Sequence, residues 1–407
     1  MRILWITLEC IYPPNTGGRI GVFKRLEQLY SKGNEIYLFY PYDSDSDLQA
    51  ERELKKYCKE VFAYKRKKSF RTLLKLLRYP YTIASRDIKE LQRDIADCIE
   101  KNNIEIINVD FPHMCVNLFG IVKNYAVPIV LNQHNIEWEF YREVAHSNKN
   151  ILKKFLYFTD SFRLKRYEER LSKKINFSGI TFVSDLDMQY YAQWIGKKEK
   201  LRLIPVGADI PSCGNEYTKK SSEKIIIFAG KMSAAPNEDA VVWFVYKILP
   251  LVLAEFPDLK FYIVGKDPTK SVLKLANRNV VVTGMVESLD EYYKTADLVV
   301  LPLRHGEGVK VKLLEAMSYA KPVVTTSVGS QGILHAENIG FRIDDEAHNF
   351  ADDCISLLKD REQAFKTGEK LYEYFLRNYT WEIIGENYQE FLQGICRKNE
   401  GSRINKP

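Results

Sequence analysis

The stretch ADLVVLPLRHGEGVKVKLLEAMSYAKPVVTTSVGSQGI, residues 296–333, decides the fold of this chain. Its DLVVLPL segment is a short, near-continuous apolar run that predicts a buried parallel strand, whereas VKLLEAMSYA has helical spacing. Because PVVTT predicts a second strand directly afterwards, the stretch is a strand–loop–helix–strand unit. Parallel strands joined through a helix place the first loop at the carboxyl edge of the sheet, where α/β proteins bind ligands.

The loop of this unit gathers groups that suit a ligand with both phosphates and hydroxyls. Glu307 lies in the loop, and Glu315 follows eight residues later in the predicted helix. Free amides and positive charges at the helix N-terminus favour an anion beside these carboxylates. The amides belong to Gly306, Gly308 and Val309, and the positive charges belong to Lys310 and Lys312.

This spacing resembles a known family. Glu307, seven further residues, Glu315 and the Ala316–Met317 that follows resemble the E-x7-E signature of retaining GT-B glycosyltransferases of family 4, in its bacterial exopolysaccharide subgroup. The resemblance implies that Glu315 holds the nucleotide ribose and that Glu307 lies by the donor sugar as a catalytic residue. It also implies an α/β chain of two doubly wound Rossmann-like domains facing across a cleft, with a C-terminal helix crossing back to the first domain.

The length of 407 residues allows two domains of roughly 200 residues each. We expect residues 1–210 together with 380–407 to form the acceptor-side domain, and residues 211–379 to form the donor-binding domain. The polar stretch at 211–224 is the expected hinge. With 45% hydrophobic and 28% charged residues, the composition is that of a globular protein.

The sequence favours a cytoplasmic protein. MRILWITLEC predicts a first strand and no signal peptide, and no window of about 20 residues lacks charge. The seven cysteines are scattered and form no C-x-x-C pair, which indicates a reducing compartment and no zinc site.

A basic region at residues 61–86 has eight lysines and arginines and no carboxylate. Within it, Lys65–Arg78 has apolar residues at helical spacing, which predicts a basic amphipathic helix. Such a helix either lies in the headgroup layer of an anionic membrane, on the inner face of the cell membrane, or docks on its own domain. The sequence leaves both open.

Two motifs of the N-terminal half have alternative interpretations. Gly17 and Gly18 resemble the family's glycine loop opposite the donor phosphates, and they also suit a tight turn that needs positive φ. The D-x-D pattern at 43–47 can hold a divalent ion in the other large glycosyltransferase architecture, but its Ser-rich setting favours a solvated loop.

His134 follows a predicted strand, with Asn135 and Glu137 beside it. Family members carry a similar H-N-x-E, so the resemblance implies that His134 contacts the donor sugar or the acceptor as a catalytic residue. A lone histidine is otherwise more often structural.

The predicted donor-binding loop departs from the family pattern. Lys231 stands where most family members have an arginine, but Pro236–Asn237 falls where a second cation is expected. We expect Lys310 and Lys312 to supply the missing charge. Gly284, just after a strand, resembles the loop that recognises the nucleotide base.

Taken together, the sequence predicts a retaining, metal-independent glycosyltransferase in bacterial surface polysaccharide synthesis. Its donor would be a UDP- or GDP-linked sugar, its acceptor a glycan or lipid-linked glycan, and it would need no cofactor, metal or nucleic acid. Two alternatives stay open: a GT-B nucleotide-sugar epimerase and a non-catalytic GT-B partner subunit.

Overall fold

A computed structural model describes residues 1–44, 46–66, 74–122, 124–148, 150–195, 200–211, 223–306, 308–333 and 335–404. The chain divides into two compact units. The first comprises Met1–Pro205 with Ile384–Pro407, and the second comprises Val206–Ile383. The hinge expected at 211–224 lies largely outside the described residues.

The first unit is built on a seven-stranded, all-parallel sheet in the order β3-β2-β1-β4-β5-β6-β7. Its strands are β1 (Arg2–Ile6), β2 (Glu35–Tyr42), β3 (Glu60–Lys65), β4 (Ile106–Asp110), β5 (Ile129–Gln133), β6 (Gly179–Phe182) and β7 (Leu201–Leu203). Its helices are α1 (Gly17–Ser31), α2 (Ser46–Leu54), α4 (Tyr81–Ala84), α5 (Lys89–Asn102), η1 (Pro112–Leu118), α6 (Glu137–Ser147), α7 (Ile151–Lys174) and α8 (Asp185–Ile195).

The second unit has a six-stranded parallel sheet in the order β10-β9-β8-β11-β12-β13. Its strands are β8 (Ile225–Ala229), β9 (Lys260–Val264), β10 (Val280–Gly284), β11 (Leu298–Leu301), β12 (Val323–Thr325) and β13 (Arg342–Ile343). Its helices are α9 (Ala235–Trp243), η3 (Phe244–Ile248), α10 (Leu249–Glu255), α11 (Lys270–Leu273), α12 (Asp290–Thr295), α13 (Val311–Ser318), η4 (Ala336–Asn338), α14 (Ala347–Lys359) and α15 (Arg361–Asn378).

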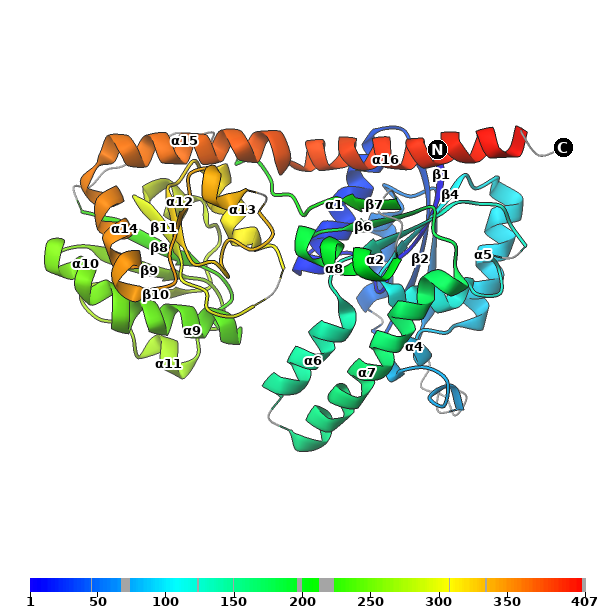
Figure 1. Ribbon diagram of the computed structural model, residues 1–407, viewed down its shortest axis with the longest axis horizontal. Helices are drawn as coiled ribbons and strands as arrows, with labels where there is room; N and C mark the ends of the chain where they lie inside the picture. The colour runs from blue at the N-terminus through cyan, green and yellow to red at the C-terminus, as the bar shows by residue number, and fades with distance from the viewer. Residues whose placement is uncertain are drawn as a thin grey trace. The chain divides into compact units, whose positions relative to one another are not determined.

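Apolar strands fill both sheets because helices cover their two faces (Figure 1). Strand β11, LVVL, is buried at every position, as the continuous apolar run predicts. Each sheet also reverses its strand order beside its first strand, at β1/β4 in one unit and β8/β11 in the other. Ligands of doubly wound sheets bind at the carboxyl ends of strands at such switch points.

The C-terminal helix α16 (Trp381–Ile404) belongs to the first unit from Ile384 onward. Its Tyr388 hydroxyl lies 2.6 Å from Asn108 Oδ1 in β4 and 2.9 Å from Asn132 Oδ1 in β5. Gly179 of β6 lies so close to this helix that a Cβ there would come within 2.5 Å of the Phe391 ring. The helix is thus an integral layer of the first unit.

The predicted helix over Lys65–Arg78 is wrong at its start. Lys65 is the last residue of β3, where it pairs with Tyr42 of β2. Residues 67–73 lie outside the described part, while Leu74 and Lys75 are helical and a turn follows. Alternation in EVFAYK is too weak against its basic surroundings to predict this edge strand.

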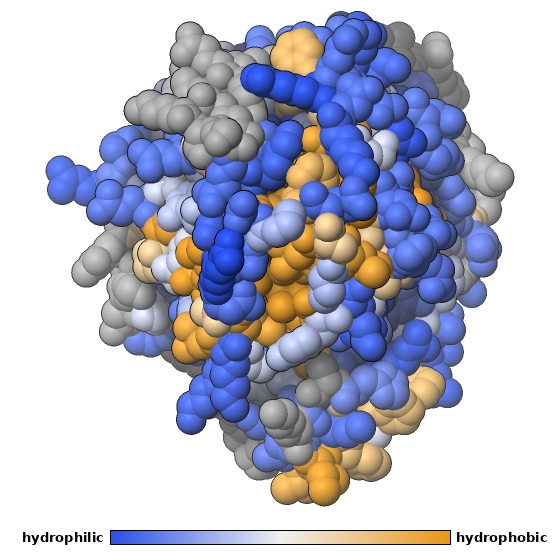
Figure 2. Space-filling view, turned by 90° about the vertical axis from the view of Figure 1, so that its left-hand side faces the viewer, coloured by the Kyte–Doolittle hydropathy of each residue, from blue (hydrophilic) through white to orange (hydrophobic). Residues whose placement is uncertain are grey.

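No helix in the described part of the chain is long and apolar enough to cross a membrane. On the face in Figure 2, hydrophilic side chains form most of the surface and hydrophobic ones gather near its centre.

Candidate functional site

Four groups meet at the switch point of the second sheet. The Lys312 ammonium, in the first turn of α13, donates to Asn237 Oδ1 in α9 at 2.6 Å. It also lies 4.4 Å from the centroid of the Phe228 ring, a cation–π distance. A Cβ on Gly230, after β8, would come within 2.8 Å of the same Nζ, so glycine leaves room for the lysine. The ammonium therefore lies beside Asn237, where the family resemblance expects a second cation.

The buried surroundings of Lys312 disfavour the charged form of its side chain. Burial, only partly offset by Glu315, lowers the pKa of Lys312 to about 7, and the positive charge of Lys310 adds to the decrease. A group with a pKa near neutrality gains its full charge when an anion arrives. Lys312 is thus suited to respond to a bound phosphate.

Glu315 is held by an aromatic residue that the sequence analysis missed. The Tyr293 hydroxyl, from α12, lies 3.2 Å from Glu315 Oε2 and donates to it. The Tyr293 ring stacks on Tyr319 with centroids 4.8 Å apart. Burial raises the pKa of Glu315, while the bond from Tyr293 and the charge of Lys312 oppose that rise. Its carboxylate is therefore oriented at the start of α13, not solvated as an ordinary surface residue.

Lys310 has a different place from Lys312. Its ammonium donates to the carbonyls of Gly306 at 3.0 Å and Gly308 at 2.7 Å, and the residue is buried. The φ values of Gly306 and Gly308 are +113° and +73°, which side chains other than glycine rarely adopt. In this structure Lys310 stabilises the loop, and Lys312 is the cation that lies at the switch point.

The first turn of α13 has no side-chain cap among the described residues, although the Leu313 amide donates to the Lys310 carbonyl at 2.8 Å. Lys310 is the N-cap residue, and no side chain in the described part of the chain caps this helix start. Val309 lies directly before it and is partly buried. Uncapped amides and a helix dipole next to Lys312 make a favourable place for an anion.

Of three other predicted residues, two are described in the second unit and one lies outside the described residues. Lys231, in the loop after β8, is exposed and lies 3.7 Å from Asp267 Oδ2. Gly284 ends β10 with φ of +69° and accepts from the amide of Gly265 at 3.2 Å. Glu307 lies outside the described residues, so its predicted position beside the donor sugar stays a prediction.

In the first unit, His134 joins a buried charge network at the switch point beside β1 and β4. Its Nε2 lies 2.8 Å from Asp110 Oδ1, and Arg25 Nη2 lies 3.2 Å from the same oxygen. The hydrogen bond with His134 and the charge of Arg25 lower the pKa of Asp110 against the effect of its burial, whereas burial lowers the pKa of His134. Phe111 stacks on the imidazole with centroids 4.2 Å apart and has the unusual φ of +67°.

Gly17 and Gly18 begin α1, where Thr16 Oγ1 accepts from the amide of Arg19. Both are helical, so the alternative of a tight turn with positive φ is wrong. A Cβ at either position would meet no atom within 4 Å. The two glycines therefore leave the start of α1 open at the carboxyl edge of the first sheet.

The first carboxylate of the D-x-D pattern, Asp43, forms an ion pair with Arg66. Asp43 accepts both a 2.6 Å bond from Arg66 Nε and a short bond from Arg66 Nη2. Asp45 lies outside the described residues, and Asp47 belongs to α2. Across the described ranges, no three or more His, Cys, Asp and Glu side chains group in a way that holds a metal ion.

A second buried polar cluster of the first unit joins η1, α6 and α7. His113 Nε2 lies 3.8 Å from Glu137 Oε2, and both residues are almost completely buried. Burial raises the pKa of Glu137 to about 8 and lowers that of His113 well below its usual value. The two groups are therefore neutral near pH 7. Sequence patterns gave no signal for this cluster, because its members are far apart along the chain.

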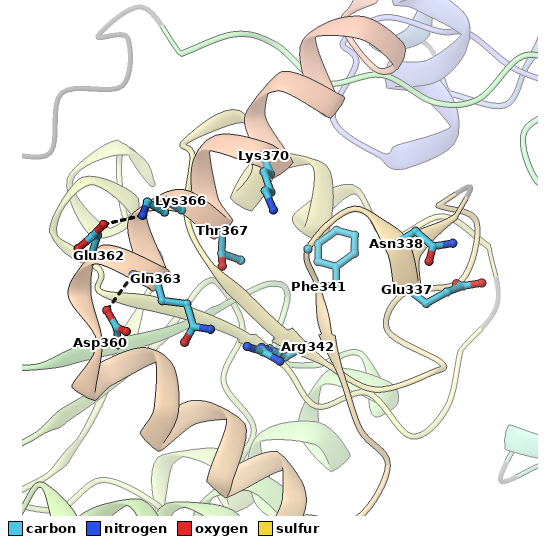
Figure 3. A pocket seen from close by; sticks show the side chains of 11 residues that line it. Glu337, Asn338, Phe341, Arg342, Asp360, Glu362, Gln363, Lys366, Thr367 and Lys370 are labelled. Atoms are coloured by element: carbon cyan, nitrogen blue, oxygen red, sulfur yellow. Dashed lines mark hydrogen bonds and ion pairs between the residues drawn. The ribbon is translucent and has the colours of Figure 1, made fainter.

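A hollow of about 590 Å³ lies between β13, η4 and α15 of the second unit (Figure 3). Phe341, Thr367 and Lys370 are among its lining residues, and none of the predicted donor residues is. A hollow of about 610 Å³ lies at the amino-terminal edge of the same sheet, beside Lys224, Asp297 and Pro322. Both hollows are separate from the switch point of the sheet.

Comparisons with known proteins agree with this geometry. Residues 223–360 match the family model for glycosyl transferases group 1. The matched residues cover most of the second unit, so this unit is similar to the glycosyl transferases of group 1. The match contains β8, α9, β11 and α13, and with them Lys312, Asn237 and Glu315.

Three similar proteins extend the comparison beyond this domain. An uncharacterized 44.6 kDa protein in the cps region of Klebsiella pneumoniae is 26% identical, over 81% of this chain and 84% of its own. Poly(glycerol-phosphate) alpha-glucosyltransferase of Bacillus subtilis (strain 168) is 24% identical, over 53% of this chain and 34% of its own. The crystal structure of Anabaena Alr3699/HepE in complex with UDP matches with a TM-score of 0.63 and 14% identity, over 97% of this chain and all of that one.

These matches establish the fold and the class of the protein. The two parallel-sheet units have the GT-B architecture, as the sequence predicted. The family model and a relative named as a glucosyltransferase make the chain a glycosyltransferase.

Proposed function

We propose that the protein transfers a sugar from a nucleoside diphosphate sugar to a glycan or lipid-linked glycan acceptor during polysaccharide synthesis. The observation that carries this proposal is the Lys312 ammonium beside Asn237 at the start of α13. A relative in a cps region and a neighbouring structure that holds UDP support the pathway and the donor class.

The proposed donor site stabilises the negative charge that develops on the diphosphate as its bond to the sugar breaks. The diphosphate lies against the amides at the start of α13 and the Lys312 ammonium, with Lys231 nearby. As the sugar leaves, negative charge grows on the terminal phosphate, and a preorganised cation and helix dipole stabilise it. A divalent metal is therefore not required in this proposal.

The proposed roles of the carboxylates follow the family resemblance. Glu315, oriented by Tyr293, accepts hydrogen bonds from the nucleotide ribose. Glu307 stabilises the donor sugar, and the anomeric configuration is retained. His134, held by Asp110 and Phe111, contacts the donor sugar or the acceptor.

The first test replaces two donor-site residues. We expect Glu315→Ala and Lys312→Ala each to lower donor turnover at least about tenfold, which corresponds to about 1.4 kcal/mol of transition-state stabilisation. Lys274→Ala, an exposed lysine in the same unit, is the matched control. Unchanged turnover in both site variants would exclude this site.

A second experiment separates transfer from epimerisation and tests the metal. The donor is incubated alone and with acceptor, with and without a chelator, and the products are followed by nuclear magnetic resonance. Transfer with a retained anomeric configuration that persists in chelator supports the proposal. An altered hexose on intact nucleotide, without acceptor, would instead make the chain an epimerase. Binding of donor without either reaction would make it a non-catalytic partner.

A further inference from the structure

The helices α6 and α7 form an antiparallel hairpin that extends from the rest of the first unit (Figure 1). The first six residues of α7 are all exposed. Four of these six are large apolar residues with exposed fractions of 63 to 82%: Ile151, Leu152, Phe155 and Leu156. Exposed apolar residues are common singly, but a contiguous group of this size marks an interaction surface.

The apolar residues follow one stripe of α7. Ile151, Phe155, Phe158 and Phe162 recur at i, i+4, i+7 and i+11, and Leu152 and Leu156 form a second row beside them. Phe158 and Phe162 are 39 and 54% exposed, and their rings contact edge to face. We call these six residues the α7 stripe. An amphipathic helix normally buries such a stripe against its own core, and this one is left open.

Contacts of α7 with described neighbouring segments lie away from the first turns of the stripe. Helix α6 packs along one side, where Tyr141 and His146 contact Tyr157 and Phe158. On another side, Asp160 accepts from the amide of Tyr81 at 3.0 Å. Neither contact covers Ile151, Leu152 or Phe155.

The segment at residues 74–81 continues the surface beside the stripe. It is joined to α7 because Arg163 Nη2 donates to the carbonyl of Tyr79 at 2.8 Å. Its large side chains are also exposed, with Leu74, Leu77 and Tyr81 at 57, 89 and 51%. Two separate pieces of the chain thus present apolar side chains next to one another.

The segments of sequence that carry these apolar side chains are rich in positive charge. Residues 149–166 contain six lysines and arginines and one carboxylate, and the neighbouring region 61–86 contains eight and none. Lys153 and Lys154 lie in the first turn of α7, within the exposed apolar group. Lysine and arginine beside exposed apolar and aromatic side chains are typical of helices that lie in the headgroup layer of anionic membranes.

We propose that the α7 stripe and residues 74–81 dock this protein on an anionic lipid bilayer, with the apolar side chains entering the acyl boundary and the lysines contacting lipid phosphates. A second copy of the chain fits this surface less well, because a two-fold interface would bring the same positive charges together. Figure 2 shows hydrophobic side chains at its lower edge, where Figure 1 places the turn between α6 and α7.

This inference rests on the proposed function, because a lipid-linked acceptor lies in a bilayer. It assigns the membrane contact to the α6–α7 hairpin as well as to the basic segment. The test measures lipid binding independently of sugar transfer. Loss of sugar transfer with intact vesicle binding would remove the proposed activity and leave the docking surface standing.

The test is co-sedimentation of the full-length protein with vesicles of pure phosphatidylcholine and of phosphatidylcholine with 30% phosphatidylglycerol, a mixture on the order of natural anionic content. We expect binding to the anionic vesicles only. Leu152→Glu/Phe155→Glu and Lys153→Glu/Lys154→Glu should each reduce it about tenfold or more. Leu273→Glu, at a residue 52% exposed in the second unit, is the matched control and should bind as the natural protein does.

Thermal unfolding and analytical ultracentrifugation complete the experiment. All four positions of the hairpin variants are exposed, so their unfolding midpoints should stay within a few degrees of the natural protein's. Equal binding to neutral vesicles, or unchanged binding in the Leu152→Glu/Phe155→Glu variant, would overturn the proposal. A dimer that this variant dissociates, with no binding of the natural protein to vesicles, would assign the surface to a second copy instead.

Discussion

At the scale of single residues, Lys312 combines the features that the proposed chemistry needs. Its ammonium lies between a polar partner, Asn237, and an aromatic face, Phe228. Burial brings its pKa to about 7, so near neutrality the unliganded protein holds this charge only part of the time. A diphosphate placed beside it favours the charged form and raises the pKa again.

This coupling predicts proton uptake on donor binding. Calorimetry in two buffers of different ionisation enthalpy should show roughly half a proton taken up at pH 7 and nearly one at pH 8. Donor affinity should accordingly fall as the pH rises above about 7. The ligand should be the intact nucleotide sugar, because a free nucleoside diphosphate titrates in the same range.

The comparison variant is Lys312→Arg. A guanidinium stays charged throughout this pH range, so the variant should bind donor without proton uptake and with little pH dependence. Equal proton uptake in both proteins would show that another group titrates.

The sequence predicted part of this arrangement around Lys312. The spacing of Lys312 and Glu315 on one predicted helix follows from a local pattern, and the missing cation at Pro236–Asn237 follows from the family resemblance. The contact of Lys312 with Asn237 joins residues 75 positions apart, and the bond from Tyr293 joins another helix. Only the folded sheet brings such residues together, and for the same reason Arg25 and Asp110 beside His134 were missed.

At the scale of helices and strands, η1, α6 and α7 enclose Glu137 and His113. The folded-state pKa of Glu137, about 8, exceeds its ordinary value of 4.5, so the folded protein binds the additional proton between these values. The resulting stabilisation is complete below about pH 4.5 and is lost as the pH rises through 8.

We predict that the natural protein loses about 1 kcal/mol more unfolding free energy than Glu137→Gln between pH 7 and pH 8.5. Urea unfolding at the two pH values measures this difference. Glutamine keeps the shape of the protonated carboxyl and does not titrate. Equal losses in both proteins would mean that Glu137 is ionised in the folded state at neutral pH.

Elements with strong periodicity were predicted well. The strand expected in DLVVLPL and the helix expected in VKLLEAMSYA are observed as β11 and α13. Strands β3, β7 and β13 were missed, because β7 and β13 have two or three residues and β3 has no fully buried position. Such strands depend on pairing with a longer neighbour, which a local pattern does not record.

At the scale of the whole molecule, the chain returns from the second unit to complete the first. The sequence predicted this return from its resemblance to a family, with the last segment beginning at residue 380. The closeness of α16 to β6 was not foreseeable, because Gly179 and Phe391 are 212 positions apart in the sequence.

This contact gives a prediction about stability. Gly179→Val should destabilise the protein by about 1–3 kcal/mol, since its side chain would overlap the Phe391 ring. Phe391→Ala in the same chain should restore part of that loss by making room, although it lowers stability when made alone. Denaturant unfolding of the two single variants and the double variant measures the coupling, and additive effects would contradict direct packing.

The bonds from Lys310 to the carbonyls of Gly306 and Gly308 have a kinetic consequence. Two peptide groups of the loop between β11 and α13 are already oriented before any nucleotide arrives, so their conformational entropy is lost when the polypeptide folds. Capture of the donor then needs little rearrangement of these two groups. A slow step in the catalytic cycle would accordingly not be the reorientation of these two peptide groups.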